Sequence, residues 1–241
     1  MPLRAVLFDA YGTMFDVHSV VRAAEGLFPG RGQQLSLLWR DKQIEYSRLV
    51  SMSSGSGRDH YRPFGQITRG ALRFAALQLG LDLSPQSEAT LVDAYGRLEP
   101  FSENRGVLAA LQQGGITTGV LSNGDPQMLA GVVRNAGFEP LLQHLISVDA
   151  CRRYKTDPAA YALGTQALQL AAHEILFVSS NGWDAIGATW FGYTTLWINR
   201  SGSPPEQLGT EPTHTGHSLK DVLDLVFPAA GPDSSGSDPS T

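Results

Sequence analysis

The sequence predicts an α/β protein: a doubly wound, Rossmann-like parallel-sheet core with an inserted helical cap domain. Three observations lead to this prediction. Short apolar runs, typical of buried parallel strands, occur at residues 5–8, 117–121, 145–148, 175–178 and 194–198. Helical patterns separate most of these runs, and such alternation favours a parallel sheet. Residues 16–97 contain no strand pattern, which indicates a helical block inserted after the first strand.

The first apolar run ends abruptly in Asp9, and a loop containing Gly12 follows. A buried strand would deliver Asp9 at its carboxyl end, where open α/β sheets place their sites. The alternative is that Asp9 caps a turn. Asp9 is therefore a candidate nucleophile, and the residues around it must decide which reaction it could perform.

The inserted block has helical patterns at residues 35–50, 64–79 and 84–98. The stretch 51–57, rich in serine and glycine, is expected to be a flexible connector. We therefore expect residues 1–15 and 98–227 to form the α/β core domain and residues 16–97 the helical cap domain. Residues 228–241, rich in proline, serine and glycine, are expected to be a disordered tail.

The rest of the core alternates as the fold class requires. Residues 106–112 and 126–136 have helical patterns, the second ending at Gly137. Asp157 and Pro158 suit a helix N-cap and first helical position, and they open a helix that we expect to reach about residue 170.

The composition of the chain limits the classes of partner that it could bind. With 241 residues and a net charge of −5, the chain offers no electrostatic basis for nucleic-acid binding. The single cysteine, Cys151, fits a reducing compartment and is interpreted as a packing residue rather than a nucleophile. The N-terminus has no signal-peptide pattern, and no apolar run approaches the ~18 residues that span a bilayer. We expect a cytoplasmic protein without membrane contact.

Four further segments fall where this topology needs site residues. They are Ser122-Asn123 after the second strand, Tyr154-Lys155 before a helix, Ser179 to Asp184 after the fourth strand, and Trp39-Arg40 on a helix of the inserted block. Together with Asp9-Ala10-Tyr11-Gly12-Thr13, they resemble the haloacid dehalogenase superfamily, and within it the L-2-haloacid dehalogenases. The resemblance covers residues 3–200.

The residues also separate this branch from the phosphatases of the superfamily. Those enzymes carry a second aspartate two residues after the nucleophile, where this chain has Tyr11, which cannot act as a general acid near neutral pH. Where they bind Mg²⁺ through acidic groups, this chain has Ser179, Ser180 and Asn181, leaving only Asp184. We therefore expect neither a metal nor an organic cofactor.

The resemblance implies a role for each charged group. Asp9 would attack C2 of a 2-haloalkanoate and form an ester on its own side chain. Lys155 would keep Asp9 ionised, and Asp184 would activate the water that hydrolyses the ester. The alternatives are a structural carboxylate for Asp9, a surface lysine for Lys155 and a helix N-cap for Asp184.

The resemblance also implies how the substrate is held. Arg40 would reach the halide or the substrate carboxylate, unless it is only a charge on the helix surface. Asn123 and Trp183 would cradle the halide, although Trp183 could equally belong to the core. Ser122 would bind the substrate carboxylate and Thr13 would position Asp9, with capping of a helix or turn as the alternative for both.

The remaining implied residues support this arrangement. Ser179 and Asn181 would hold Lys155 or Asp184 in place. Tyr11, Phe64 and Trp183 would wall an apolar pocket around the alkyl group. Tyr161 resembles a site tyrosine or only packs its own helix. Tyr46 and Trp190 are assigned to the core.

This chain departs from the family at three places. Asp41 follows Arg40 and could pair with it, Thr156 replaces the usual proline after the lysine, and residues 53–57 are rich in glycine and serine. None of these changes removes a proposed catalytic group, but they leave substrate range and rate open.

The expected activity is hydrolysis of short (S)-2-haloalkanoates to (R)-2-hydroxyalkanoates, with a small haloacid and water as partners and a possible homodimer by resemblance. The alternatives are a phosphatase of the same fold acting on a small metabolite, and a weakly catalytic homologue that only binds small carboxylates.

Overall fold

A single parallel sheet forms the centre of the molecule. The computed structural model describes residues 2–53 and 60–228; most of the predicted disordered tail and part of the predicted connector lie outside these residues. Within them, six strands follow the order β3-β2-β1-β4-β5-β6, and every neighbouring pair is parallel. The strands are β1 Ala5–Phe8, β2 Thr117–Ser122, β3 His144–Ser147, β4 Ile175–Ser179, β5 Thr194–Ile198 and β6 His214–Gly216. The predicted fold class is confirmed.

Strand β1 lies in the middle of the sheet because its four residues are apolar and can be buried on both faces. Phe8, its last residue, pairs with Val120 of β2 and Val178 of β4. The strand order reverses direction at β1, so this point is the topological switch of the sheet. The loops after β1, β2 and β4 therefore open at one edge.

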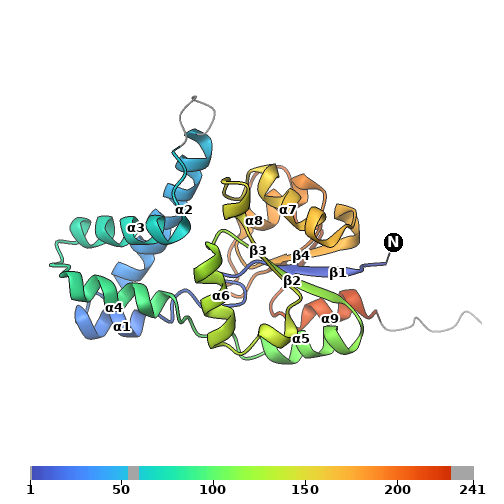
Figure 1. Ribbon diagram of the computed structural model, residues 1–241, viewed down its shortest axis with the longest axis horizontal. Coiled ribbons are helices and arrows are strands. Elements are labelled where there is room, and N and C mark those ends of the chain that lie inside the picture. Colours follow the sequence, from blue (N-terminus) through green and yellow to red (C-terminus); the bar gives the residue numbers. More distant parts are fainter. Residues whose placement is uncertain (1, 54–59, 229–241) are drawn as a thin grey trace, which may run out of the picture.

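Helices cover both faces of the sheet. In Figure 1, α7 and α8 lie above the strands, and α5 and α9 lie below them. The bounds are α5 Asn104–Gln113, α6 Pro126–Asn135, α7 Pro158–Leu168, α8 Gly182–Phe191 and α9 Asp221–Val226, with short 3₁₀ turns at Glu139–Leu141, Val148–Ala150 and Ala172–Glu174. The Asp157 side chain accepts a hydrogen bond from the Ala159 amide, so α7 begins as its cap and proline predict.

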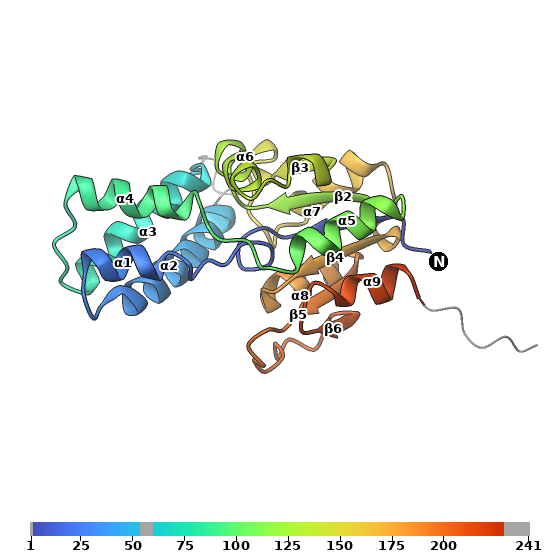
Figure 2. The ribbon, with the colours of Figure 1, turned by 90° about the horizontal axis from the view of Figure 1, so that it is seen from below.

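The helices between β1 and α5 form a separate group at one end of the sheet, shown on the left of Figures 1 and 2. We call this group the helical insertion: α1 Val21–Leu27, α2 Gly32–Ser53, α3 Phe64–Gln78 and α4 Pro85–Tyr95. Helix α2 packs on α3, and the Trp39 indole N–H donates to the Thr68 carbonyl across that contact (2.8 Å).

Two chain segments connect the helical insertion to the sheet, and they run side by side. The Asp16 amide donates to the Glu99 carbonyl (2.8 Å), and the Phe101 amide donates to the Met14 carbonyl (3.1 Å). The insertion therefore leaves and rejoins the core at neighbouring points.

Several local expectations need correction. Residues 51–53 belong to α2 and not to a connector, because Ser51 Oγ accepts the Tyr154 amide and the Ser53 hydroxyl donates back to the Val50 carbonyl. Trp190 is 57% exposed, with its indole on Thr210, so it is not a core residue. Helix α1 and strand β6 were not expected. Along the described residues, no helix combines the length and apolar character needed to cross a membrane.

Candidate active site

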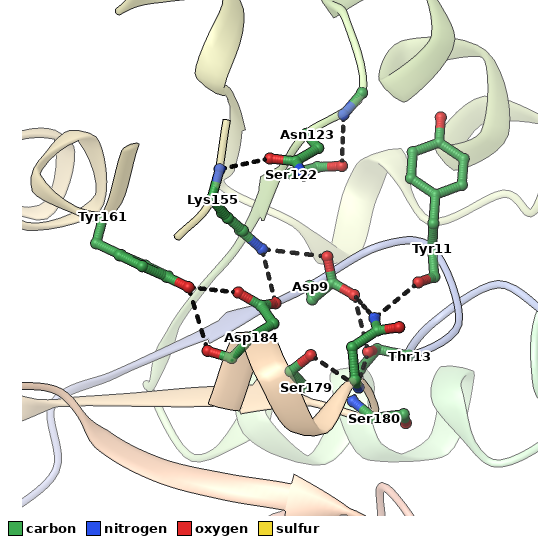
Figure 3. Close-up of polar contacts among 12 residues, drawn as sticks. Asp9, Tyr11, Thr13, Ser122, Asn123, Lys155, Tyr161, Ser179, Ser180 and Asp184 are labelled. Carbon is green, nitrogen blue, oxygen red and sulfur yellow. Dashed lines mark hydrogen bonds and ion pairs between the residues drawn. The ribbon is translucent and has the colours of Figure 1, made fainter. Parts of the chain in front are cut away.

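Three buried charged side chains meet at the edge where β1 and β4 end (Figure 3). Lys155, just before α7, places its Nζ 3.1 Å from Asp9 Oδ1 and 3.0 Å from Asp184 Oδ2. The exposed fraction is 1% for Lys155 and 0% for Asp184. Lys155 is thus not a surface lysine. Asp184 is not the N-cap of α8, because Asn181 holds that position.

The two carboxylates determine the charge of Lys155. Burial acts to lower the pKa of Lys155, but the charges of Asp184 and Asp9 outweigh it and raise that pKa above its usual value. Burial likewise raises the pKa of Asp184, with Lys155 opposing that change. Lys155 therefore remains a cation between two carboxyl groups at neutral pH.

The second oxygen of Asp9 is held by two donors. Asp9 Oδ2 accepts from the Thr13 hydroxyl (3.0 Å) and from Asn181 Nδ2 (2.9 Å). Thr13 Oγ1 in turn accepts the Ser180 amide (2.8 Å), which ties the loop after β1 to the loop after β4. Both oxygens of Asp9 therefore have fixed partners, and its side chain has one orientation.

The contacts of Ser179 and Asn181 differ from the expectation that they hold Lys155 or Asp184. Asn181 is bonded to Asp9 and to the Tyr11 carbonyl, the latter at 3.1 Å. Ser179 Oγ accepts the Asn181 amide (3.1 Å) and so shapes the turn that opens α8. The reason is position: Asn181 lies beside the loop after β1, whereas Asp184 is one helical turn further on.

Tyr161 does more than pack its helix. Its hydroxyl donates to Asp184 Oδ1 at 2.8 Å, and the residue is fully buried. Burial and the neighbouring Asp184 charge raise the pKa of Tyr161 well above its usual value, so the hydroxyl keeps its proton. Tyr161 and Lys155 therefore fix the two oxygens of Asp184 separately.

Ser122 is the last residue of β2, and Asn123 begins the loop after it. Ser122 Oγ accepts the Gly124 amide (3.0 Å), which is the turn-capping role given as its alternative. Asn123 Oδ1 accepts the Lys155 amide at 3.0 Å, so this side chain positions the lysine backbone. Of the two, Asn123 lines the cavity beside Asp9.

That cavity lies between the sheet edge and the helical insertion. Its wall is formed by Asp9, Tyr11, Arg40, Ile44, Ser47, Phe64, Asn123, Asn181 and Trp183. About 10 Å³ is open to the centre of a water molecule, which is room for one water. The three predicted wall aromatics, Tyr11, Phe64 and Trp183, are all present. Trp183 is half-buried in this wall rather than in the core.

Arg40 enters the site from α2. Its Nη2 lies 3.3 Å from the Tyr11 carbonyl and 3.4 Å from Asn181 Oδ1, so it is not merely a surface charge. Its Nη1 donates to Gln43 Oε1 at 2.7 Å. Asp41 points to solvent, and the partner of Arg40 on its own helix is Gln43 instead.

Sequence reasoning missed three residues that build the insertion side of the site: Gln43, Ile44 and Ser47. Ile44 and Ser47 lie four and seven positions after Arg40, on the same face of α2, and both line the cavity. This spacing was a usable signal for Ile44 and Ser47. Gln43 gives no such signal, since a glutamine in a helix is usually exposed.

The donors around Asp9 do not fit a magnesium ion. Lys155 Nζ contacts Asp9 Oδ1, and the Asn181 amide donates to both Asp9 Oδ2 and the Tyr11 carbonyl. Magnesium requires several hard oxygen ligands, whereas these groups present hydrogens. Over residues 2–53 and 60–228, no cluster of three acidic, histidine or cysteine side chains could hold a metal ion.

Fold and site together define the class. A buried carboxylate–lysine–carboxylate group lies at the switch point of the sheet, facing a helical insertion, and the sequence model of the haloacid dehalogenase-like hydrolases matches residues 3–192. The chain belongs to this family. Within it, the chain is 47% identical over 229 residues to the (S)-2-haloacid dehalogenase of Pseudomonas sp. (strain YL), covering 95% of this chain and 97% of that protein.

Solved structures agree. The L-2-haloacid dehalogenase RSc1362 superposes with a TM-score of 0.91 at 54% identity, covering 94% of this chain and 99% of the other. The enzyme of Xanthobacter autotrophicus, solved with chloropropionic acid covalently bound, gives a TM-score of 0.86 at 36% identity, covering 95% and 100%. The predicted family is confirmed.

Proposed function

We propose that this enzyme hydrolyses the carbon–halogen bond of short (S)-2-haloalkanoates to give (R)-2-hydroxyalkanoates. One observation carries the proposal: the Asp9 carboxylate contacts Lys155 at 3.1 Å beside a small cavity walled by aromatic rings. A carboxylate held in one orientation beside a substrate cavity can act as a nucleophile. The relative with covalently bound chloropropionic acid supports the same chemistry.

In the first step, an Asp9 oxygen forms a bond to C2 of the substrate while the carbon–halogen bond breaks. The halide leaves with the bonding electrons, and the product is an ester on Asp9. Backside displacement inverts the configuration at C2. Lys155 contacts Asp9 at Oδ1, while Thr13 and Asn181 orient it through the contacts at Oδ2.

In the second step, Asp184 takes a proton from a water molecule that attacks the carbonyl carbon of the Asp9 ester. The ester bond to the hydroxyacid breaks, the departing oxygen takes the proton held by Asp184, and Asp9 is regenerated when its new carboxyl group loses a proton. One water is consumed in the overall reaction, and one halide and one proton are released. The contacts of Asp184 with Lys155 and Tyr161 support this role, because they hold the base beside Asp9.

The charge balance favours a monoanionic substrate. Asp9 and Asp184 are countered by Lys155 and by Arg40 across the cavity. A haloacid adds one negative charge to this set. A phosphate dianion would add two, facing Asp9 without a metal to compensate, so the phosphatase alternative is not favoured.

The substrate-binding roles follow the cavity wall. Arg40, Asn123 and Trp183 would hold the halide or the carboxylate, and Tyr11 and Phe64 would enclose the alkyl group. Asn123 contacts the Lys155 backbone with its carbonyl oxygen, which leaves its amino end as a donor for an anion. Ser122 would act through the loop whose turn it caps, with the adjacent amides facing the substrate carboxylate.

The first experiment is halide release from both enantiomers of 2-chloropropionate, with and without EDTA. We expect release from the (S) enantiomer only, unchanged by chelation. Activity that disappears with EDTA and returns with Mg²⁺ would favour the phosphatase. Binding that stabilises the protein without turnover of any haloacid would favour the weakly catalytic homologue.

The second experiment follows the oxygen. A single turnover in ¹⁸O water should place the label on Asp9 and leave the first hydroxyacid unlabelled. Label in that first product would show direct attack of water on the substrate and would contradict the ester mechanism.

We keep three organisational expectations as proposals. Residues 16–97 act as a cap over the site, the protein works in the cytoplasm, and it forms a homodimer. Exposed apolar side chains on α2 and α3 support the last of these: Leu37, Leu49, Met52 and Leu77. Sedimentation of the purified protein would test it, and a monomer at micromolar concentration would contradict it.

A further inference from the structure

Gln43 is a completely buried glutamine in the helical insertion, one turn after Arg40 on α2. Its side chain makes three hydrogen bonds. Oε1 accepts from Arg40 Nη1 (2.7 Å) and from the Tyr95 hydroxyl (2.8 Å), and Nε2 donates to Thr68 Oγ1 (2.7 Å). A buried amide with this many partners is a positioning device rather than a tolerated polar residue.

The direction of each bond is fixed by the next one. The Thr68 hydroxyl donates its hydrogen to the Phe64 carbonyl at 2.8 Å, so its oxygen must accept from Gln43. The amino end of Gln43 therefore faces Thr68, and its carbonyl end faces Arg40. Gln43 consequently presents only an acceptor to the guanidinium.

These bonds join helices α2, α3 and α4 behind the cavity wall. Phe64, whose carbonyl ends the chain of bonds, is the first residue of α3 and lines the cavity. The Tyr95 ring, at the end of α4, stacks on the Tyr11 ring at 5.7 Å between centroids. Gln43 thus links Arg40 to two further sides of the same wall.

Arg40 lies closer to Gln43 than to its partners on the sheet side. The contact with Gln43 is 2.7 Å, whereas those with the Tyr11 carbonyl and with Asn181 are 3.3 and 3.4 Å. Gln43 is neutral, whereas a carboxylate in its place would pair with Arg40 and cancel its charge. An amide can therefore orient the guanidinium and leave its charge for an anionic ligand.

We propose that Gln43 is a positioning residue that holds Arg40 toward the cavity without neutralising it. The proposal rests on the proposed role of Arg40 in binding the haloacid. It adds a residue that touches no substrate and acts only through Arg40 and the network behind it.

The test is a double-mutant cycle on kcat/KM for (S)-2-chloropropionate. Gln43→Met removes the acceptor with little change in volume and should lower kcat/KM by about tenfold or more. In an Arg40→Lys background the same change should cost less than about twofold, because the guanidinium is already absent. Gln33→Met, an exposed glutamine on the same helix, is the matched control and should have no effect.

The outcomes separate this inference from the function on which it rests. Arg40→Lys with unchanged kcat/KM would refute the role of Arg40. A second outcome would overturn only the positioning role. In it, Arg40→Lys lowers kcat/KM, and Gln43→Met lowers kcat/KM by the same factor in the wild-type and Arg40→Lys backgrounds, as a purely structural residue would.

A second variant keeps the test decisive if Gln43→Met fails to fold. Gln43→Glu retains acceptor oxygens for Arg40 and Tyr95 in nearly the same shape. We expect a folded protein with kcat/KM lowered at least about tenfold, because the new carboxylate neutralises Arg40. Wild-type kcat/KM in this variant would overturn the proposal.

Discussion

The two sides of the active site are built differently. On the sheet side, buried Asp9, Lys155 and Asp184 are joined by contacts of 3.0 and 3.1 Å, and Tyr161 adds another at 2.8 Å. On the insertion side, half-buried Arg40 reaches the core only at 3.3 and 3.4 Å. The groups that would perform chemistry thus all belong to the sheet side, whereas Arg40 and Phe64, two of the groups that would hold the substrate, come from the helical insertion.

The space between the two sides has room for about one water. Arg40 spans this space with long contacts, which are weaker than short ones. Elsewhere the insertion is held to the core by shorter hydrogen bonds, from the Gly65 amide to Asp125 Oδ2 (2.9 Å) and from the Tyr154 amide to Ser51 Oγ (2.8 Å). The long contacts are therefore a property of Arg40 and not of the whole boundary.

Among substitutions on the sheet side, Asp9→Asn should have the largest effect on activity. The variant keeps the shape of the side chain but removes the attacking carboxylate, so halide release should fall by at least about ten-thousandfold. Halide release is measured on the purified variant, and circular dichroism and the melting temperature verify that the variant is folded. Retained wild-type release would refute Asp9 as the nucleophile.

Asp184→Asn separates the two chemical steps. Attack by Asp9 needs no base, so each enzyme molecule should still release one halide. Steady-state turnover should then be about 10²- to 10⁴-fold slower, because the base for ester hydrolysis is missing. Rapid-mixing halide release shows the burst, and intact-protein mass spectrometry shows the ester. Full turnover without accumulated ester would assign the base to another group.

The pH dependence of ester hydrolysis should identify Asp184 as the base by a second route. Burial raises the pKa of Asp184 above the ordinary value of 3.8. As the pH falls through that raised pKa, the base is protonated and ester hydrolysis slows, so the fraction of enzyme trapped as ester should rise. Quenched samples taken between about pH 4 and pH 8 measure that fraction by mass. A fraction that does not change with pH would contradict the assignment.

The smallest effect is expected across the boundary between the two sides. The Arg48 guanidinium of α2 lies 5.0 Å from the centre of the Trp183 ring. At an exposed site such a cation–π contact contributes about 0.5–1 kcal/mol. Arg48→Ala should therefore change KM by about two- to fivefold and leave kcat nearly unchanged. Steady-state kinetics test this, with Arg22→Ala, an exposed arginine away from the cavity, as control. A large drop in kcat would show that Arg48 takes part in the chemistry.

The sheet could be predicted because its strands are buried on both faces and therefore consist of apolar runs. Strands β1 and β5 have the bounds that their runs predict. Strand β6 could not be found in this way, because its three residues lie at the sheet edge and include His214 and Thr215. Helix α1 was not predicted because its start carries no capping signal: no side chain caps it at Val20.

The site shows the same division. Residues next to strand ends could be expected to meet, since parallel strands deliver their carboxyl ends to one edge. The direction of each side chain could not be predicted from the sequence. Asn181 bonds to Asp9, and Trp183 lies in the cavity wall. The role of Gln43 could not be predicted from the sequence. Its partners Thr68 and Tyr95 lie on other helices of the insertion, and only packing brings them together.

The paired connecting segments have a practical consequence. Because Asp16 bonds to Glu99 and Met14 to Phe101, the stretch between them begins and ends at adjacent points of the backbone. Chain exchanges succeed where such junctions lie close together. We expect that residues 17–98 can be grafted from one relative onto another as a cassette, which exchanges Arg40 and Phe64 of the cavity wall while the recipient keeps Asp9, Lys155 and Asp184.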